Sequence, residues 1–392
     1  MTQFSFSLLT GDTGPLVKGN TPDRLCIPSD NHVPIMAEGD QVLAGTRIAT
    51  AKRHGDGDLH SPLAGIIRTV HDYVIDIEIT GKERTSPNKF AADGSTSLKD
   101  WLHDLGVKTS DMKQAATLVI NAVPPEPGIS IHEPLLRDYR KTIELGLQTV
   151  QRIVSPSKIY LATAKGNRTN AFSNCTVTYV TPVHPNGVEP LVIKKVTGQE
   201  VLLGAKPDNV VLISVRELYF IGRVMETGRP VTETVMTIGK QNHLVHIGTP
   251  VGFLASENGM TPQPGDRIVM GGLMRGMAAR DLEQGVTKDT TGLNILRTNE
   301  GFEASDNPCL GCGECERRCP ARIMPGMLSR CAEFKYFERA EEFHIHSCIE
   351  CGICGYWCKA QRPLLQYIRL AKYELALLRS NNADNDRNGE TQ

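Results

Sequence analysis

Two stretches of nearly the same sequence lie close to the C-terminal end, CLGCGECERRCP at 309–320 and CIECGICGYWCK at 348–359. Each places four cysteines at offsets 0, 3, 6 and 10, and the second copy begins 39 residues after the first. Cysteines at offsets 0, 3 and 6 form a tight loop whose sulfurs converge, whereas the turn that follows carries the fourth away. The repeat therefore predicts a pair of metal-binding loops, each with one cysteine left over.

Bacterial ferredoxins bind two [4Fe–4S] clusters with this spacing, and the fourth cysteine of each run ligates the other cluster. We therefore expect two [4Fe–4S] clusters with crossed ligands. The first cluster takes Cys309, Cys312, Cys315 and Cys358, and the second takes Cys348, Cys351, Cys354 and Cys319. The alternative is structural zinc, which favours paired hooks with two ligands each. Three closely spaced ligands followed by a longer gap, twice over, fit that pattern poorly.

The composition supports a metal site and excludes several other classes. Of 392 residues, 40% are hydrophobic and 22% charged, and the net charge is −1, which gives no reason to expect nucleic acid as a partner. Nine of the eleven cysteines lie between Cys309 and Cys358, which is typical of metal ligation in a reducing compartment. No apolar run approaches the roughly 18 residues of a spanning helix, so we expect membrane contact to be indirect.

The remaining cysteines and histidines give no catalytic site. Cys26, Cys175 and Cys331 stand outside the two spacings, and we expect them to pack as small apolar residues. Three histidines of the N-terminal region lack companion ligands at metal spacing: His54, His60 and His71. We expect no catalytic residue in the isolated chain.

The pattern along the chain predicts a multidomain α+β protein. A helix at 132–154 between strands at 115–122 and 158–164 predicts a parallel strand pair. Short strands are expected at 246–254 and 262–272, and helices at 325–343 and from 363 onward. The predicted units are an N-terminal segment (1–28), a barrel-sandwich domain (29–80), an α/β domain (81–215), a β-grasp module (216–300), a two-cluster ferredoxin-like α-helical domain (301–378) and a disordered tail (379–392).

The barrel-sandwich assignment depends on EGDQVLAGTRIATA at 38–51 and HSPLAGIIRTV at 60–70, which resemble biotinyl and lipoyl domains. Those domains carry a modified lysine at a hairpin tip, where this sequence has Lys52. The tip AKRHGDGD lacks the usual flanking residues, so a solvated turn lysine is the favoured interpretation.

Over residues 10–375 the chain resembles the C subunit of the Rnf ion-translocating electron-transport complex. The resemblance is carried by PLVKGN, VTPVHPNGVEPLVIKKVTGQEV, DRIVMGGLMRGM, VTKDTTGLNIL and the double cysteine run with PLLQYIRLAKYEL. It implies a peripheral subunit on the cytoplasmic face of the bacterial inner membrane, which contacts the other subunits of the complex. It also implies a soluble-ligand-binding type of β-grasp fold near 246–277 and an α/β domain similar to the flavin subunit of complex I.

The sequence departs from that family where FMN and NADH bind. The family's glycine-rich loop wraps the cofactor phosphates with backbone N–H groups. In the corresponding region, within 102–128, only Gly106 remains at the place where several glycines are expected. The acidic segment similar to NADESEPG has become NAVPPEPG, in which Glu126 alone matches as a remnant of the flavin and NADH region. We therefore expect neither FMN nor NADH to bind; the alternative is that the divergent loop still binds them.

These observations favour a subunit of an ion-translocating oxidoreductase that relays electrons through two clusters and couples their flow to Na⁺ or H⁺ transport. Its electrons would come from a carrier such as ferredoxin or a cytochrome. Two alternatives stay open: a flavin-binding, NADH-oxidising input subunit, and a soluble ferredoxin-like adaptor of another reductase. Lys359 replaces the proline that closes the first run, and a lysine there would raise a cluster potential. A basic rim for an acidic carrier is expected from Arg317, Arg318, Arg322 and Arg362.

Overall fold

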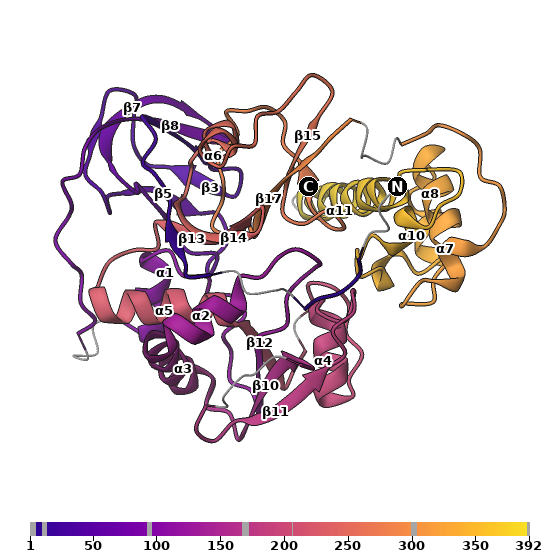
Figure 1. Cartoon of the computed structure of the whole chain (residues 1–392), viewed down its shortest axis with the longest axis horizontal. Coiled ribbons are helices and arrows are strands. Elements are labelled where there is room, and N and C mark those ends of the chain that lie inside the picture. Colours follow the sequence, from indigo (N-terminus) through magenta and orange to yellow (C-terminus); the bar gives the residue numbers. More distant parts are fainter. Residues whose placement is uncertain are drawn as a thin grey trace.

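The computed structural model describes residues 5–9, 14–91, 96–166, 172–205, 207–298 and 304–389, with side chains up to Ser380. The chain forms a mixed α+β, multidomain structure (Figure 1). Two small sheets, a parallel sheet with helices and a six-stranded sheet make up the body, and a helical C-terminal domain lies at its side. The predicted α+β class is therefore confirmed.

Two antiparallel sheets form the first region and share one apolar core. One sheet has the order β2 (Arg24–Pro28), β8 (Val74–Gly81), β7 (Ala64–His71), β4 (Gln41–Val42). The other has the order β3 (His32–Pro34), β5 (Arg47–Ala51), β6 (Leu59–His60). Alternation along β8 places Ile75 and Ile77 in the core, as its period of two predicts. The sheet begins at Arg24, so it includes part of the segment 1–28 that was predicted to precede it.

The second region is a four-stranded, all-parallel sheet. Its order is β11 (Thr176–Val180), β10 (Lys158–Ala164), β9 (Thr117–Asn121), β12 (Val210–Ser214). The predicted parallel pairing of β9 with β10 is confirmed. The single helix predicted at 132–154 is wrong in one respect, because Tyr139 leaves the helical conformation and divides it into α2 (His132–Asp138) and α3 (Arg140–Val154).

Helix α3 packs closely against α5 (Val215–Thr227) through two glycines. A Cβ added to Gly146 would lie 2.0 Å from the Leu218 carbonyl oxygen, and one added to Gly222 would lie 1.9 Å from that of Thr142. Any larger residue at either position would therefore push the helices apart. The remaining helices of this region are α1 (Leu98–Asp104) and α4 (Glu189–Thr197). Helix α5 therefore belongs to this region, whereas the boundary predicted after residue 215 assigns it to the next unit.

The third region is a mixed sheet of six strands. The order is β1 (Val17–Lys18), β14 (Gln241–His246), β13 (Glu233–Ile238), β17 (Gly292–Leu296), β15 (Arg267–Met270), β16 (Met277–Ala278). The strand predicted at 262–272 is present as β15, but the strand predicted at 246–254 is wrong. Only its first residue lies in β14, and α6 (Val251–Glu257) follows. Val251, Leu254 and Ala255 are buried at helical spacing. A short apolar run of this kind is compatible with either a helix or a strand, so the sequence alone did not distinguish them.

The C-terminal domain consists of short helices around one long helix. These are α7 (Glu314–Arg317), α8 (Pro325–Glu333), α9 (Arg339–Glu342), the 3-10 helix η1 (Ile345–Ser347), α10 (Ile353–Tyr356) and α11 (Leu364–Gly389). The predicted helix 325–343 ends at Glu333, and Phe334, which follows it, is 58% exposed. Cys331 is buried in the core between α8 and α11, as predicted.

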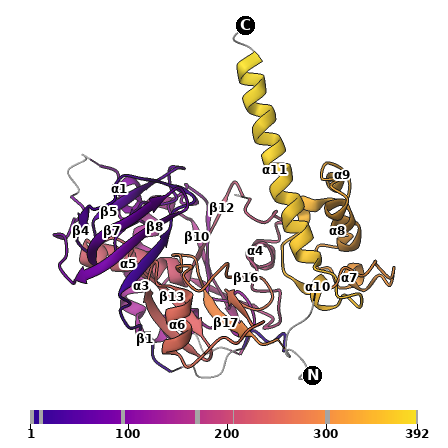
Figure 2. The ribbon, with the colours of Figure 1, turned by 90° about the horizontal axis from the view of Figure 1, so that it is seen from above.

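Helix α11 continues past the boundary that was predicted at residue 378. It reaches Gly389 and projects away from the rest of the molecule (Figure 2), so much of the predicted disordered tail 379–392 continues the helix. Residues 390–392 lie outside the described part of the chain, as does the boundary predicted at 300. Among the described residues, no helix has the length and apolar character needed to cross a bilayer.

Candidate metal centre

The two cysteine runs have the same backbone conformation. Left-handed residues occur two, four and thirteen positions after the first cysteine of each run: Gly311, Gly313 and Arg322 in the first, and Glu350, Gly352 and Gln361 in the second. Short helices begin at matching positions, α7 in the first run and α10 in the second. The second run adopts a left-handed turn at Glu350 although it has no glycine there. The repeat in the sequence is therefore also a repeat in structure.

The second run forms a pocket that also receives a cysteine from the first. Cys348, Cys351 and Cys354 line it together with Cys319, and apolar neighbours such as Ile323 and Leu365 close it. The three cysteines of the second run are each 8% exposed. Burial, and to a smaller extent the neighbouring thiols of Cys348 and Cys319, raise the pKa of Cys351 to about 12. Deprotonation of four crowded thiols is costly here unless a cation binds the thiolates, and four thiols that line one pocket are a ligand set that fits a metal cluster.

The first run is arranged in the same way but lies at the surface. Cys309 and Cys312 are exposed, whereas Cys315 and Cys358 are half-buried. Cys315 interacts electrostatically with both Cys309 and Cys358, so the last cysteine of the second run lies beside the first run. The Gly311 N–H donates to Cys309 Sγ at 3.4 Å. The structure thus brings together cysteines from both runs at two places, and the assignment of ligands to two clusters stays a prediction.

The buried cysteine set, by which we mean Cys319, Cys348, Cys351 and Cys354, lies against the body of the molecule. His184 Nε2 donates to the Cys351 carbonyl at 2.7 Å. Lys372 Nζ donates to the Cys348 carbonyl at 2.8 Å and pairs with Glu350 at 2.8 Å. Sequence reasoning missed His184 and Lys372. They bind the carbonyls of Cys351 and Cys348, which lie 167 and 24 positions away, and nothing in the local sequence marks such distant contacts.

An aromatic group covers the junction of the two runs. The Arg318 guanidinium lies 3.7 Å from the ring centroid of Trp357, so a residue of the first run stacks on a residue of the second. Phe6 of the N-terminal segment lies parallel to Trp357 and edge-on to Tyr356. These contacts fasten the N-terminal segment to the metal-binding domain.

Glu126 is buried and bound to backbone. Its carboxylate accepts hydrogen bonds from the N–H groups of Gly272, Met274 and Arg275, at 3.0, 3.1 and 2.9 Å. The side chain is 4% exposed. The role at a flavin that the sequence suggested stays a prediction, because the carboxylate is here occupied by the loop between β15 and β16.

A wide pocket lies between the first region, the loop after α1 and the N-terminal ends of α4 and α5, with about 1100 Å³ of empty space. Glu189 and Glu217 stand at those helix ends, and burial together with Glu217 raises the pKa of Glu189. The Glu217 carboxylate caps α5 by accepting from the Ser214 N–H at 2.8 Å. The basic side chains of Arg53, Lys108 and Lys113 line the same pocket, so its charge is mixed, although carboxylates stand at the helix ends where a phosphate would bind.

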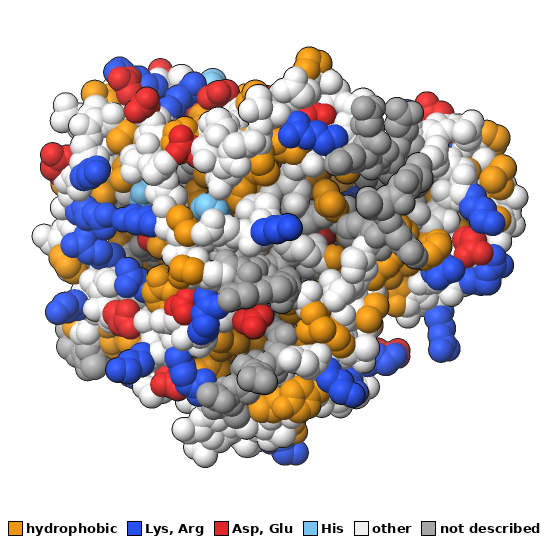
Figure 3. Space-filling model, viewed as in Figure 1, with side chains coloured by type: hydrophobic (Ala, Val, Ile, Leu, Met, Phe, Trp, Pro, Cys, Tyr) orange, Lys and Arg blue, Asp and Glu red, His pale blue; other side chains and the backbone are white. Residues whose placement is uncertain are grey.

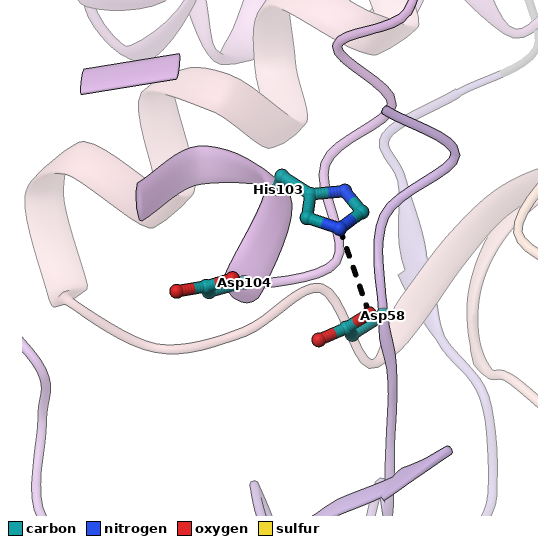
Figure 4. A group of neighbouring side chains, drawn as sticks. All are labelled: Asp58, His103 and Asp104. Atoms are coloured by element: carbon teal, nitrogen blue, oxygen red, sulfur yellow. Dashed lines mark ion pairs between the residues drawn. The ribbon is translucent and has the colours of Figure 1, made fainter. Parts of the chain in front are cut away.

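Asp58, His103 and Asp104 form a third group of possible metal ligands (Figure 4). Two of them, Asp58 and His103, bind other groups of the protein. Asp58 pairs with Arg47 at 3.0 Å and accepts from the Ala51 N–H at 3.0 Å. His103 Nδ1 accepts from the Gly57 N–H at 3.1 Å, so its Nε2–H faces Asp58 at 3.7 Å. The group joins α1 to the first region and leaves few free donors for an ion.

The other predicted positions have ordinary partners. Lys52 donates to the Asp30 carbonyl at 2.7 Å, which fits the interpretation as a turn lysine. His54 faces Asp100 at 3.3 Å, and His60 is buried. Cys26 is buried and Cys175 is partly buried, as expected of packing residues.

The predicted basic rim is wrong at one position. Arg362 is 3% exposed and is paired with Glu333 at 2.7 Å, so it belongs to the interior of the C-terminal domain. Arg317 and Arg318 lie at the surface, where both pair with Glu314. Figure 3 shows basic side chains along the outer edge of this domain on the face that it displays.

Comparison with known proteins finds C subunits of oxidoreductase complexes among the relatives of this chain. No protein-family model matches the chain. It is 27% identical to the C subunit of the proton-translocating ferredoxin:NAD(+) oxidoreductase complex of Clostridium ljungdahlii, over 92% of this chain and 90% of the relative. It is also 27% identical to the C subunit of the ion-translocating oxidoreductase complex of Pasteurella multocida, over 86% of this chain and 46% of the relative. The chain therefore spans about half the length of that second protein.

Among solved structures, an NAD⁺-reducing [NiFe]-hydrogenase in the H₂-reduced state matches with a TM-score of 0.42 and 11% identity, over 74% of this chain and 63% of that chain. This likeness is too low to establish a shared fold. The sequence relatives and the cysteine-rich C-terminal domain agree with the predicted resemblance. The chain is thus a homologue of the C subunits of Rnf-type, ion-translocating oxidoreductase complexes, with 25–27% identity over most of its length.

Proposed function

We propose that this chain is an electron-transfer subunit of an Rnf-type membrane complex and that it holds two [4Fe–4S] clusters. One observation carries the proposal: Cys319 of the first run lines a pocket with Cys348, Cys351 and Cys354 of the second. If each run bound a zinc ion of its own, Cys319 would lie with the other cysteines of the first run. Exchange of the fourth cysteine is the arrangement of two-cluster ferredoxins.

The exposed cysteine set is then Cys309, Cys312, Cys315 and Cys358, and the buried cysteine set holds the second cluster. A bound cluster supplies a one-electron redox couple. The chain supplies thiolates, backbone N–H donors and exclusion of water; the N–H groups of Glu350, Ile353 and Gly355 are aimed at sulfurs of the buried set. Such hydrogen bonds and burial tune the potential of a cluster.

The two sets differ in access, which suggests a route. The exposed set can be reached by a separate redox carrier, such as ferredoxin or a cytochrome, whereas the buried set faces the body of the chain. We place the chain peripherally, at the cytoplasmic face of the inner membrane, in contact with other subunits that couple electron flow to Na⁺ or H⁺ transport. The names of the relatives support this placement, since they describe ion-translocating complexes.

The α/β region acts as a scaffold in this proposal, because only Gly106 remains where the phosphate-binding loop of the family has several glycines. Electrons therefore come from a donor other than NADH. The name of the Clostridium ljungdahlii relative includes NAD(+), which favours an NADH-oxidising input subunit as the second candidate. We further assign the paired sheets at 24–81 to a barrel-sandwich fold and the six-stranded sheet to a β-grasp module.

Iron and acid-labile sulfide analysis of the anaerobically purified chain, followed by EPR, tests the proposal. We expect about eight irons and eight sulfides per chain, from two [4Fe–4S] clusters. Tightly bound zinc without sulfide would overturn it. Addition of NADH then separates the two candidates, since only the second predicts bleaching of the cluster absorbance.

Cysteine variants test the crossed ligand sets. Cys319→Ser should remove the signal of the buried cluster although Cys319 belongs to the first run, and Cys358→Ser should remove that of the exposed cluster. Cys331→Ala, which changes a buried thiol outside both sets, is the matched control and should keep both signals. Loss of the cluster of its own run in either serine variant would contradict the exchange.

A further inference from the structure

A loop of the six-stranded sheet reaches the buried cysteine set from outside the C-terminal domain. This loop, 271–276, joins β15 to β16. Arg275 Nε donates to the Glu350 carbonyl at 3.2 Å, and the Arg275 carbonyl accepts from Arg369 at 2.7 Å. A Cβ on Gly352 would lie 2.2 Å from the Met274 carbonyl oxygen, so the two backbones are in close contact. The loop therefore packs directly on the turns that carry Cys348 and Cys351.

Glu126 holds the same loop from the opposite side. Its carboxylate binds three backbone N–H groups of the loop, those of Gly272, Met274 and Arg275. A Cβ on Gly272 would lie 2.2 Å from Glu126 Cδ, so the backbone can approach the carboxylate only because residue 272 is glycine. A buried carboxylate satisfied in this way leaves the loop little freedom to take another conformation.

Arg275 is the cation that this loop presents to the buried set. The field of its guanidinium acts on Cys351 and on His184. Two other basic residues lie near the buried set, Arg369 and Lys372. Both form ion pairs with the Glu350 carboxylate, at 2.9 and 2.8 Å. Among the described residues Arg275 forms no side-chain ion pair, although its field also reaches the Glu189 carboxylate.

We propose that Arg275 sets the reduction potential of the cluster on the buried cysteine set, and that Glu126 is the positioning residue that keeps Arg275 there. The inference rests on the proposed function, since it requires a cluster. The reduced form of a cluster carries one more negative charge than the oxidised form. A cation beside the cluster that is not held in an ion pair, in a site of low dielectric, favours the reduced form and raises the potential.

The test is an EPR-monitored redox titration of the anaerobic full-length chain with its clusters. Arg275→Met should make reduction of the buried cluster about tenfold less favourable. This corresponds to a midpoint potential lower by about 59 mV for one electron. The potential of the exposed cluster should not change. Arg275→Lys keeps the charge and should restore most of the shift. Glu126→Gln also removes a negative charge, so it is followed by hydrogen exchange, which should become faster in the loop 271–276, and Arg275→Met should shift the potential by less in the Glu126→Gln background.

Arg317→Met is the matched control, because Arg317 acts on Cys312 and Cys315 of the exposed set and is paired with Glu314 at 2.7 Å. It should leave the buried cluster unchanged. Equal potentials of the buried cluster in the parent and Arg275→Met proteins would overturn the inference, as would loss of that cluster in both the Met and the Lys variants. Absence of iron and sulfide from the parent protein would instead overturn the proposed function, so the two failures are distinguishable.

Discussion

Gly313 and Gly352 occupy the same position in the two cysteine runs and offer a matched pair of substitutions. Both adopt the left-handed backbone conformation, with φ of 70° at Gly313 and 79° at Gly352. A Cβ on Gly313 would meet only the end of the flexible Arg317 side chain, at 3.3 Å. A Cβ on Gly352 would lie 2.2 Å from the backbone carbonyl oxygen of Met274. The two sites therefore share their backbone strain and differ in one contact.

The cost of alanine can be worked out for each site. A left-handed alanine costs about 1–2 kcal/mol, and this applies at both positions. At Gly352 the methyl group also forces the loop 271–276 away from the run, and overpacking of this kind costs about 1–3 kcal/mol more. We expect Gly313→Ala to lower the free energy of unfolding by about 1–2 kcal/mol and Gly352→Ala by about 2–5 kcal/mol.

The assay should follow the contact itself, because a multidomain chain does not unfold in one step. Hydrogen–deuterium exchange of the anaerobic protein reports the backbone of 271–276 directly. Gly352→Ala should speed exchange in this segment and in 348–354, whereas Gly313→Ala should affect only 309–315. Equal exchange of 271–276 in the two variants would refute the contact between the loop and the run.

Three further perturbations have defined outcomes. Arg362→Met removes a buried cation that binds Glu333 and the Asn307 carbonyl at 2.7 and 2.9 Å. It should cost about 2–3 kcal/mol in denaturant unfolding of the C-terminal domain, whereas Arg379→Met at an exposed ion pair should cost under about 1 kcal/mol; equal costs would contradict the burial of Arg362. Lys288→Met removes hydrogen bonds from Nζ to the carbonyls of Asp56, Gly57 and Gly106, at 2.7, 3.0 and 3.3 Å. It should lower the melting temperature and speed hydrogen exchange around 55–58 and 106–109, and unchanged exchange at both would argue against this junction. Burial lowers the pKa of His60 and His132 to about 4. The unfolded chain takes up these protons below about pH 6.5 and the folded chain does not. Stability should therefore be full above that pH and fall toward pH 4 by about 1.4 kcal/mol per unit for each histidine; His132→Asn should reduce this slope, and an unchanged slope would show that His132 does not contribute.

The sequence predicted features that depend on local spacing. The cysteine offsets predicted two equal loops, and the structure gives the two runs the same left-handed positions even where Glu350 replaces glycine. Apolar runs and a helix between them predicted the parallel pairing of β9 with β10. In each case the signal lies within one element or between neighbours along the chain.

Features that depend on distant contacts were predicted poorly. Arg362 follows the second cysteine run and was expected at the surface together with the arginines of the first run, but Glu333 on another helix binds it in the interior. The segment 246–254 has an apolar run that fits a strand as well as it fits α6, and only packing decides between them. His184 and Arg275 gave no signal, because their roles exist only where three regions of the chain meet.

The two runs raise the question of what makes two equal motifs different. Their cysteine spacing and backbone conformation match, so local sequence alone would give two sites of the same character. The exposed set faces solvent, whereas the buried set is packed against His184, the loop 271–276 and α11. Burial and fixed charges change a reduction potential while the ligands stay the same. The difference in potential that a directional relay needs must therefore come from the residues packed on each run, and Arg275, held by Glu126, is the residue where that difference can be tested.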